Sequence, residues 1–357
     1  MTTRVSETRA AAPRPADDAP RRGLVLGGGG MLGAAWTVGA LCAVEEAVGW
    51  QPGSAEVVLG TSAGAILGAM LAGGVRADQL RDHQRGLPVT TGPLAGVDFD
   101  YDTAVGGALP PRPRAGIGSP GLLRDAVRHP REYPLLTMVS AMAPHGRGSL
   151  APVGDLVRGL LGPGGFPDGS PLRVAAVDYR SGHRVVFGDP DAPPAVVAEA
   201  VMASCAIPGW FTPVRVDGSA YVDGGCWSAT NADLMLGRGL DEVYVLAPMG
   251  LRLDPRGRTE SSEGPGRGTL AALREWRARD RPRGVLAQLV GRYRRAVTRQ
   301  LLREARVLRE SGVRVHLLAP TLADLAVMGP NMMDPARRGA VLESALQTSR
   351  AALDGVR

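Results

Sequence analysis

A serine flanked by glycines follows a short apolar run and is the first candidate for chemistry. Residues 60–64 read GTSAG, which has the G-x-S-x-G spacing, and the apolar residues 57–59 lead into it. A nucleophilic hydroxyl at a sharp strand-to-helix turn needs small residues two positions away on either side, and the next helix N-terminus stabilises negative charge there. The plainer alternative is that Ser62 only caps a helix. The apolar run before the motif and the Ala-rich segment after it favour the other interpretation, so we predict Ser62 as nucleophile, with Gly60 and Gly64 forming its elbow.

Four consecutive glycines at residues 27–30, followed by Gly33, form a second candidate site. Residues 28–33 satisfy the dinucleotide-binding pattern G-x-G-x-x-G, but that fold also requires an acidic residue after the second strand. Here the second apolar run is followed by GTS, and Glu56 precedes it. Consecutive glycines also let backbone N–H groups converge on a developing oxyanion, whereas an ordinary tight turn would not justify their entropic cost. We therefore predict an oxyanion hole at Gly28, Gly29 and Gly30.

The base that activates the serine must come from elsewhere in the chain. Asp223 stands where the predicted strand 220–222 ends, before Gly224 and Gly225, and strand ends often carry catalytic groups in α/β sheets. The competing Asp217-Gly218 pair is explained as the tip of a two-residue hairpin. The five histidines lie in segments that carry no such signal: His83, His129, His145, His183 and His316.

Two successive strand–turn–helix units near the start of the chain must position these groups. Residues 23–26 and 57–59 are short apolar runs, and each is followed by glycines and then by helical spacing. Such units predict a parallel sheet covered by helices. Further on, the pattern predicts hairpins over 172–187 and 214–222, strands at 242–247 and 313–318, and helices over 195–206 and 284–310.

The predicted organisation has four parts. They are a disordered leader at 1–22, a catalytic domain at 23–247 with a cap or loop region at 86–150, an Arg/Gly-rich loop at 248–283, and a C-terminal segment at 284–357 that packs on the catalytic domain. The helix over 284–310 has an apolar stripe for packing, and its opposite face carries Arg292, Arg295, Arg299, Arg303 and Arg306.

Composition narrows the class of protein. The formal net charge is +6, the pI is about 9.8, and all 41 basic residues are Arg, which favours contact with phosphate head groups. No pattern of a nucleic-acid-binding motif is present. Three scattered cysteines and no apolar leader favour a cytoplasmic protein, with peripheral contact to anionic membranes left open.

Taken together, the blocks at residues 27–33, 60–64, 203–209 (ASCAIPG) and 223–225 (DGG) resemble the patatin-like phospholipases. The resemblance covers about residues 23–247 and implies a three-layer α/β/α fold with a mostly parallel central sheet. It also implies a Ser/Asp dyad without histidine, with Ser62 as nucleophile and Asp223 as proton acceptor. The family usually carries a basic residue where this chain has Leu32, which bears on head-group contacts there and leaves the backbone N–H groups unaffected.

The expected function is therefore hydrolysis of a lipid or other acyl ester through an acyl-enzyme on Ser62. We expect no metal or organic cofactor and no nucleic-acid partner. Phospholipids, lysophospholipids, acylglycerols and thioesters all remain open as substrates. The alternatives are a non-catalytic lipid-binding or regulatory protein on the same scaffold and, less favoured, a nucleotide-dependent oxidoreductase.

Overall fold

The computed structural model describes residues 19–97, 99, 111–129, 133–252 and 285–353. Most of the predicted leader and of the predicted loop at 248–283 lies outside the described residues. The helices are α1 Gly30–Val48, α2 Ala63–Ala72, α3 Ala77–Gln84, α5 Pro120–Arg128, α6 Leu135–Met142, α7 Ala151–Leu161, α8 Val197–Ser204, α10 Val285–Glu310, α11 Leu322–Met328 and α12 Arg338–Leu353.

Eight strands form one sheet. Successive hydrogen-bonded pairs follow the path β5-β6-β3-β2-β1-β7-β8, and β4 also pairs with β3. Their bounds are β1 Arg22–Leu26, β2 Val57–Thr61, β3 Leu172–Asp178, β4 Arg184–Phe187, β5 Val214–Val216, β6 Ser219–Asp223, β7 Glu242–Leu246 and β8 Arg314–Leu318. The run β3-β2-β1-β7-β8 is parallel, and β4, β5 and β6 pair antiparallel. The predicted mostly parallel sheet is thus confirmed, as are both predicted hairpins.

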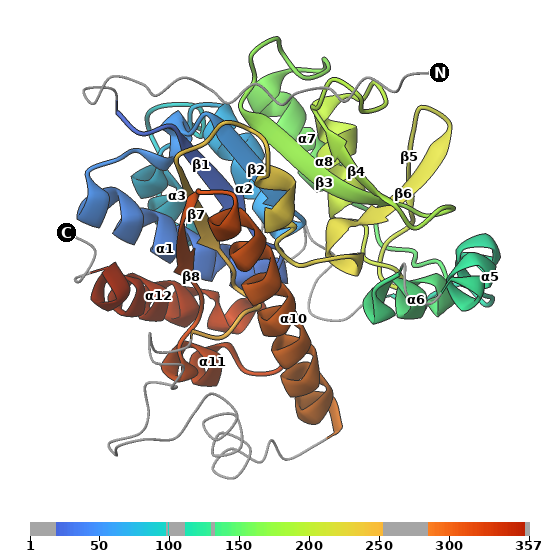
Figure 1. Ribbon diagram of the computed structural model, residues 1–357. Helices are drawn as coiled ribbons and strands as arrows, with labels where there is room; N and C mark the ends of the chain where they lie inside the picture. Colours follow the sequence, from blue (N-terminus) through green and yellow to red (C-terminus); the bar gives the residue numbers. More distant parts are fainter. Residues whose placement is uncertain (1–18, 98, 100–110, 130–132, 253–284, 354–357) are drawn as a thin grey trace, which may run out of the picture.

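Helices cover both faces of this sheet, which gives the predicted three layers (Figure 1). Successive side chains of a strand point to opposite faces. In β1, Leu24 and Leu26 join a core with α1, α2 and α12, whereas Val25 joins a core with α10. The predicted cap region contains α5 and α6, which pack on β3 and β6 through residues such as Leu122 and Val177.

Helix α1 is the first long helix after the glycine block. Among the described residues it is the one helix long and apolar enough to cross a membrane by length and composition. However, 67% of its apolar window is buried within the protein. Its buried residues share a core with α2, α3 and α12, so α1 has the surroundings of a core helix.

The register of β3 explains how two distant parts of the chain meet. Strand β4 runs along one edge of β3. On the other edge Ala175 pairs with Thr61 of β2, and the next residue, Ala176, pairs with Asp223 of β6. The ends of β2 and β6 therefore meet on the same edge, and this brings Asp223 next to Ser62, the residue after Thr61.

Candidate active site

Ser62 occupies a strained turn between β2 and α2. Its backbone has φ 54° and ψ −124°, a conformation that costs a side-chain-bearing residue about 1–3 kcal/mol and is found mainly at functional sites. The tightness of the turn explains the two predicted elbow glycines. A Cβ at Gly60 would overlap Ala65, and a Cβ at Gly64 would overlap the carbonyl of Leu26.

A second buried serine, Ser204, holds the elbow in place. The Ser62 N–H donates to Ser204 Oγ at 2.8 Å, and the Ser204 hydroxyl donates to the Ala175 carbonyl at 2.6 Å. Ser204 thus ties the turn to β3. It lies in the segment 203–209, but this role was not predicted, because a serine at the end of a helix carries no signal of a long-range contact.

Asp223 lies beside Ser62, and both side chains are almost fully buried, at 5% and 7% exposure. The carboxylate accepts a hydrogen bond from the Gly225 N–H, at 2.6 Å to Oδ1, and lines the same cavity as Ser62. Burial raises the pKa of Asp223 to about 6, although the neighbouring Ser62 hydroxyl and the Gly225 N–H act in the opposite direction. A carboxylate with that pKa is a stronger base than an exposed one and is still ionised at neutral pH.

A second layer of polar contacts holds the end of β2 from the opposite face. Asn231 donates from Nδ2 to Thr61 Oγ1 at 3.1 Å and to the Ser228 carbonyl at 2.7 Å. Glu304 of α10 fixes the same loop, because its carboxylate accepts from Thr230 Oγ1 at 2.7 Å and from the Ala232 N–H at 2.9 Å. Neither Asn231 nor Glu304 was predicted from the sequence.

The glycine block at residues 27–30 passes close to Ser62. A Cβ at Gly28 would lie 3.1 Å from the Ser62 Cβ, so a side chain at this position would crowd the serine. The structure departs from the predicted oxyanion hole in one respect: the Gly28 N–H donates to the Ala229 carbonyl at 2.8 Å and is not free. Within the described part of the chain, the N–H groups of Gly29 and Gly30 have no acceptor, and these two remain the predicted donors.

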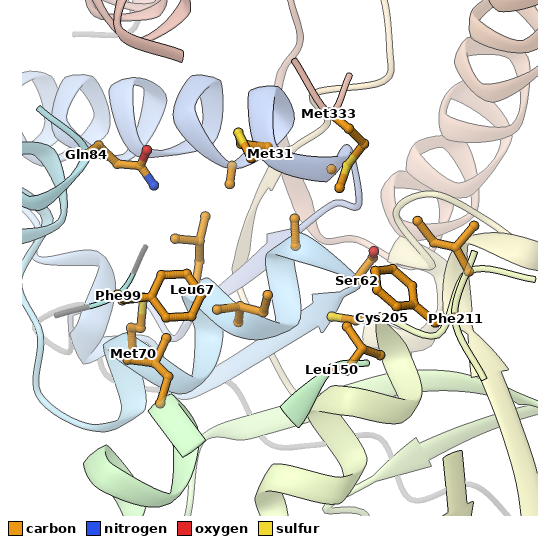
Figure 2. A pocket seen from close by; sticks show the side chains of 16 residues that line it. Met31, Ser62, Leu67, Met70, Gln84, Phe99, Leu150, Cys205, Phe211 and Met333 are labelled. Carbon is orange, nitrogen blue, oxygen red and sulfur yellow. The ribbon is translucent and has the colours of Figure 1, made fainter. Parts of the chain in front are cut away.

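Two cavities meet at Ser62. The larger, of about 350 Å³, also contacts Asp223, the glycine block, Val139 of α6 and Tyr293 of α10. The smaller extends from Ser62 along α2 between apolar side chains (Figure 2). Ser62 therefore lies where a bound molecule could reach it from two sides.

The rejected candidates lie away from these cavities. Asp217 is an exposed residue at the hairpin tip, where φ values of 46° and 76° at Asp217 and Gly218 match a two-residue turn. The five histidines are all described, and none of them lines either cavity. His316 of β8, for example, stacks on Tyr244 of β7, with ring centroids 4.5 Å apart.

Comparison with known proteins shows which family has a matching sequence. The patatin-like phospholipase family matches residues 24–236. Among solved structures, VipD from Legionella pneumophila shares 14% identity at a TM-score of 0.40, and the match covers 94% of this chain and 67% of VipD. The type III effector protein ExoU shares 16% identity at a TM-score of 0.31, and the match covers 94% of this chain and about half, 53%, of ExoU. No curated protein sequence matches the chain. Because the family match spans more than half of the 357 residues, the chain belongs to the patatin-like phospholipase family.

Proposed function

We propose that this chain is a serine lipid acyl hydrolase that uses a Ser62/Asp223 dyad. The observation that carries the proposal is the position of Ser62, on a strained elbow, beside the buried carboxylate of Asp223 on the wall of one cavity. A general base within hydrogen-bond reach of a hydroxyl is the requirement for activating a serine. Membership of the patatin-like phospholipase family supports an acyl ester of a lipid as the substrate.

The reaction follows from the positions of the groups. Asp223 accepts the Ser62 proton as Oγ attacks the ester carbonyl carbon. The N–H groups of Gly29 and Gly30 stabilise the oxyanion of the tetrahedral intermediate, helped by the N-terminus of α2. The protonated Asp223 then gives its proton to the leaving alcohol, and an acyl-enzyme remains on Ser62. Water, activated by Asp223, releases the carboxylic acid.

The alternative from the same scaffold is a protein that binds lipid without hydrolysing it. A purely binding role gives no reason for an aspartate whose pKa is raised by burial beside a strained serine. Such features cluster at catalytic sites, which favours the hydrolase.

Replacement of Ser62 tests the proposal directly. We expect Ser62→Ala to abolish both labelling by a fluorophosphonate and hydrolysis of short-chain p-nitrophenyl esters, because only an activated serine performs these reactions. Ser54→Ala, which removes a surface serine outside both cavities, is the matched control and should behave as the unmodified protein. Hydrolysis by Ser62→Ala at the unmodified rate would remove Ser62 from the mechanism.

We also propose that the protein is cytoplasmic and works at the surface of anionic membranes. Beside the larger cavity, Val139 and Met142 of α6 are exposed by 53% and 59%. On α10, Arg292 is exposed next to Tyr293, which lines the same cavity. Exposed apolar and basic side chains around a cavity mouth suit contact with a lipid surface.

A further inference from the structure

The smaller cavity extends away from Ser62 along one face of α2. The residues of this face that line it recur at helical spacing: Ala63, Ile66, Leu67 and Met70. From Ser62 to Met70 is eight residues, or about 12 Å at the rise of an α-helix. Figure 2 shows Ser62 at one end of the cavity and Gln84, with Phe99 and Met70, toward the other.

The size and lining of this cavity suit a single acyl chain. Its volume is about 60 Å³, and because a water-sized group needs roughly 10–15 Å³, it takes a row of a few such groups. The lining is mainly aliphatic and aromatic, and beyond α2 it includes Leu150, Leu156 and, beside Ser62, Phe211. Between these two ends, the described residues offer a glycerol or phosphate group no charged or amide side chain.

The far end of the cavity is not apolar. Gln84, the last residue of α3, is only 2% exposed, and its Oε1 has no hydrogen-bond partner among the described residues. Leaving a buried acceptor unpaired is unfavourable, and most such atoms in folded proteins have a partner. A trapped water needs two to four polar partners, and the other described residues that Figure 2 labels at this end are Met70 and Phe99.

We propose that Gln84 is a specificity-determining residue that selects acyl chains carrying a hydroxyl group about six to ten carbons from the ester carbonyl. This inference rests on the proposed function, which puts the ester carbonyl of a bound acyl chain at position 62. An extended chain advances about 1.2 Å per bond, from roughly 3.6 Å per three backbone bonds, so about ten bonds span the 12 Å path. A hydroxyl both donates and accepts, so it pairs with the Gln84 amide in either orientation.

Matched esters test the selection. We would measure kcat/KM for the p-nitrophenyl esters of hexanoic, octanoic and decanoic acid and of their ω-hydroxy counterparts. The unmodified protein should prefer at least one hydroxylated ester over its plain partner by about tenfold, the effect of one net buried hydrogen bond. Gln84→Met, of similar size but without the amide, should lose this preference and should keep its activity on the acetate ester.

Thr37→Val is the matched control. Thr37 is fully buried on α1, and its Oγ1 also lacks a partner among the described residues, but it does not line the cavity. This variant also removes an unpaired buried oxygen, and it should keep the preference for the hydroxylated ester. Loss of the preference in Thr37→Val to the same extent as in Gln84→Met would show a general effect of core polarity and would overturn the proposal.

Two further outcomes separate this inference from the proposed function. If the unmodified protein hydrolyses plain and hydroxylated esters equally at every length, the inference is wrong and the hydrolase stands. If no ester is hydrolysed at all, the proposed function fails. The selectivity assigned to Gln84 is then tested by measuring the binding of two methyl esters. In that case Ser62→Ala protein should bind methyl 10-hydroxydecanoate about tenfold more tightly than methyl decanoate, and equal binding would overturn the inference.

Discussion

At the scale of single residues, Asp223 carries the chemistry through its environment. Aspartate in water has a pKa of about 3.9, whereas burial raises that of Asp223 to about 6. The charged form is the base, so it is lost as the pH falls through this value. We therefore expect kcat/KM for a p-nitrophenyl ester to rise with pH, with a midpoint near 6, and to level off above it. An activity that is flat from pH 5 to 8 would rule out Asp223 as the titrating base.

Substitution of the same residue gives a sharper comparison. Asp223→Asn keeps the shape and the contact with the Gly225 N–H but cannot accept a proton, so we expect kcat/KM to fall by about 10²–10⁴. Asp217→Asn is the matched control, because Asn-Gly suits the same hairpin turn, and it should change kcat/KM little. A larger loss in Asp217→Asn than in Asp223→Asn would reverse the assignment of the base.

At the scale of elements, the end of β2 is fixed from both faces of the sheet. Ser204 holds the elbow by accepting the Ser62 N–H, and Asn231 donates to Thr61 on the other side. The Asn231 Nδ2 donates to acceptors at Thr61, Gly224 and Ser228, whereas its Oδ1 accepts from Arg184 at 3.3 Å. The Asn231 backbone has φ 52°, which asparagine tolerates better than most residues. Its amide is therefore required as a donor.

Asn231→Asp should consequently be damaging despite the small change in shape. A carboxylate cannot donate, and a buried unpaired donor or acceptor costs about 1–3 kcal/mol, more for charged groups. We expect the free energy of unfolding to fall by at least about 2 kcal/mol on that basis. The control is Asp233→Asn, which makes the reverse change in the same short segment, where Asp233 is half-buried and pairs with Arg184. A smaller effect of Asn231→Asp than of this control, in urea unfolding, would contradict the assigned role.

Local patterns explain which elements could be predicted. The apolar runs at β1, β2 and β7, the Asp217-Gly218 turn and the GTSAG elbow are each encoded within a few neighbouring residues, and the structure has all of them. The capture of the Gly28 N–H by Ala229 depends instead on where a loop about 200 residues away lies, and α10 positions that loop through Glu304. Contacts of this kind are tertiary and leave no periodic signal in the sequence.

At the scale of the whole molecule, α10 joins the fold to the cavity mouth. Its apolar stripe faces the protein interior: Leu301, Ala305 and Leu308 are buried, the first and last in the core with β1 and β7. Its exposed face carries Arg292 next to Tyr293, which lines the cavity, Arg299 about 9 Å further along the helix, and Arg306 and Arg309 beyond it. Thirteen residues separate Tyr293 from Arg306, which places the two ends about 20 Å apart along the helix.

This separation allows the membrane proposal to be tested by position as well as by charge. Each basic side chain close to an anionic surface contributes about 1 kcal/mol to membrane binding. At 0.1 M ionic strength, salt screens this attraction at distances beyond about 10 Å. We expect the protein to co-sediment with anionic liposomes at low salt, and to do so less as salt rises or on neutral lipid. Arg292→Gln with Arg299→Gln should weaken this binding more than Arg306→Gln with Arg309→Gln, which makes the same change in net charge farther from the cavity. Equal losses from the two pairs would mean that α10 attracts the membrane only through its overall charge, and binding that ignores both salt and lipid charge would exclude its arginines from the contact.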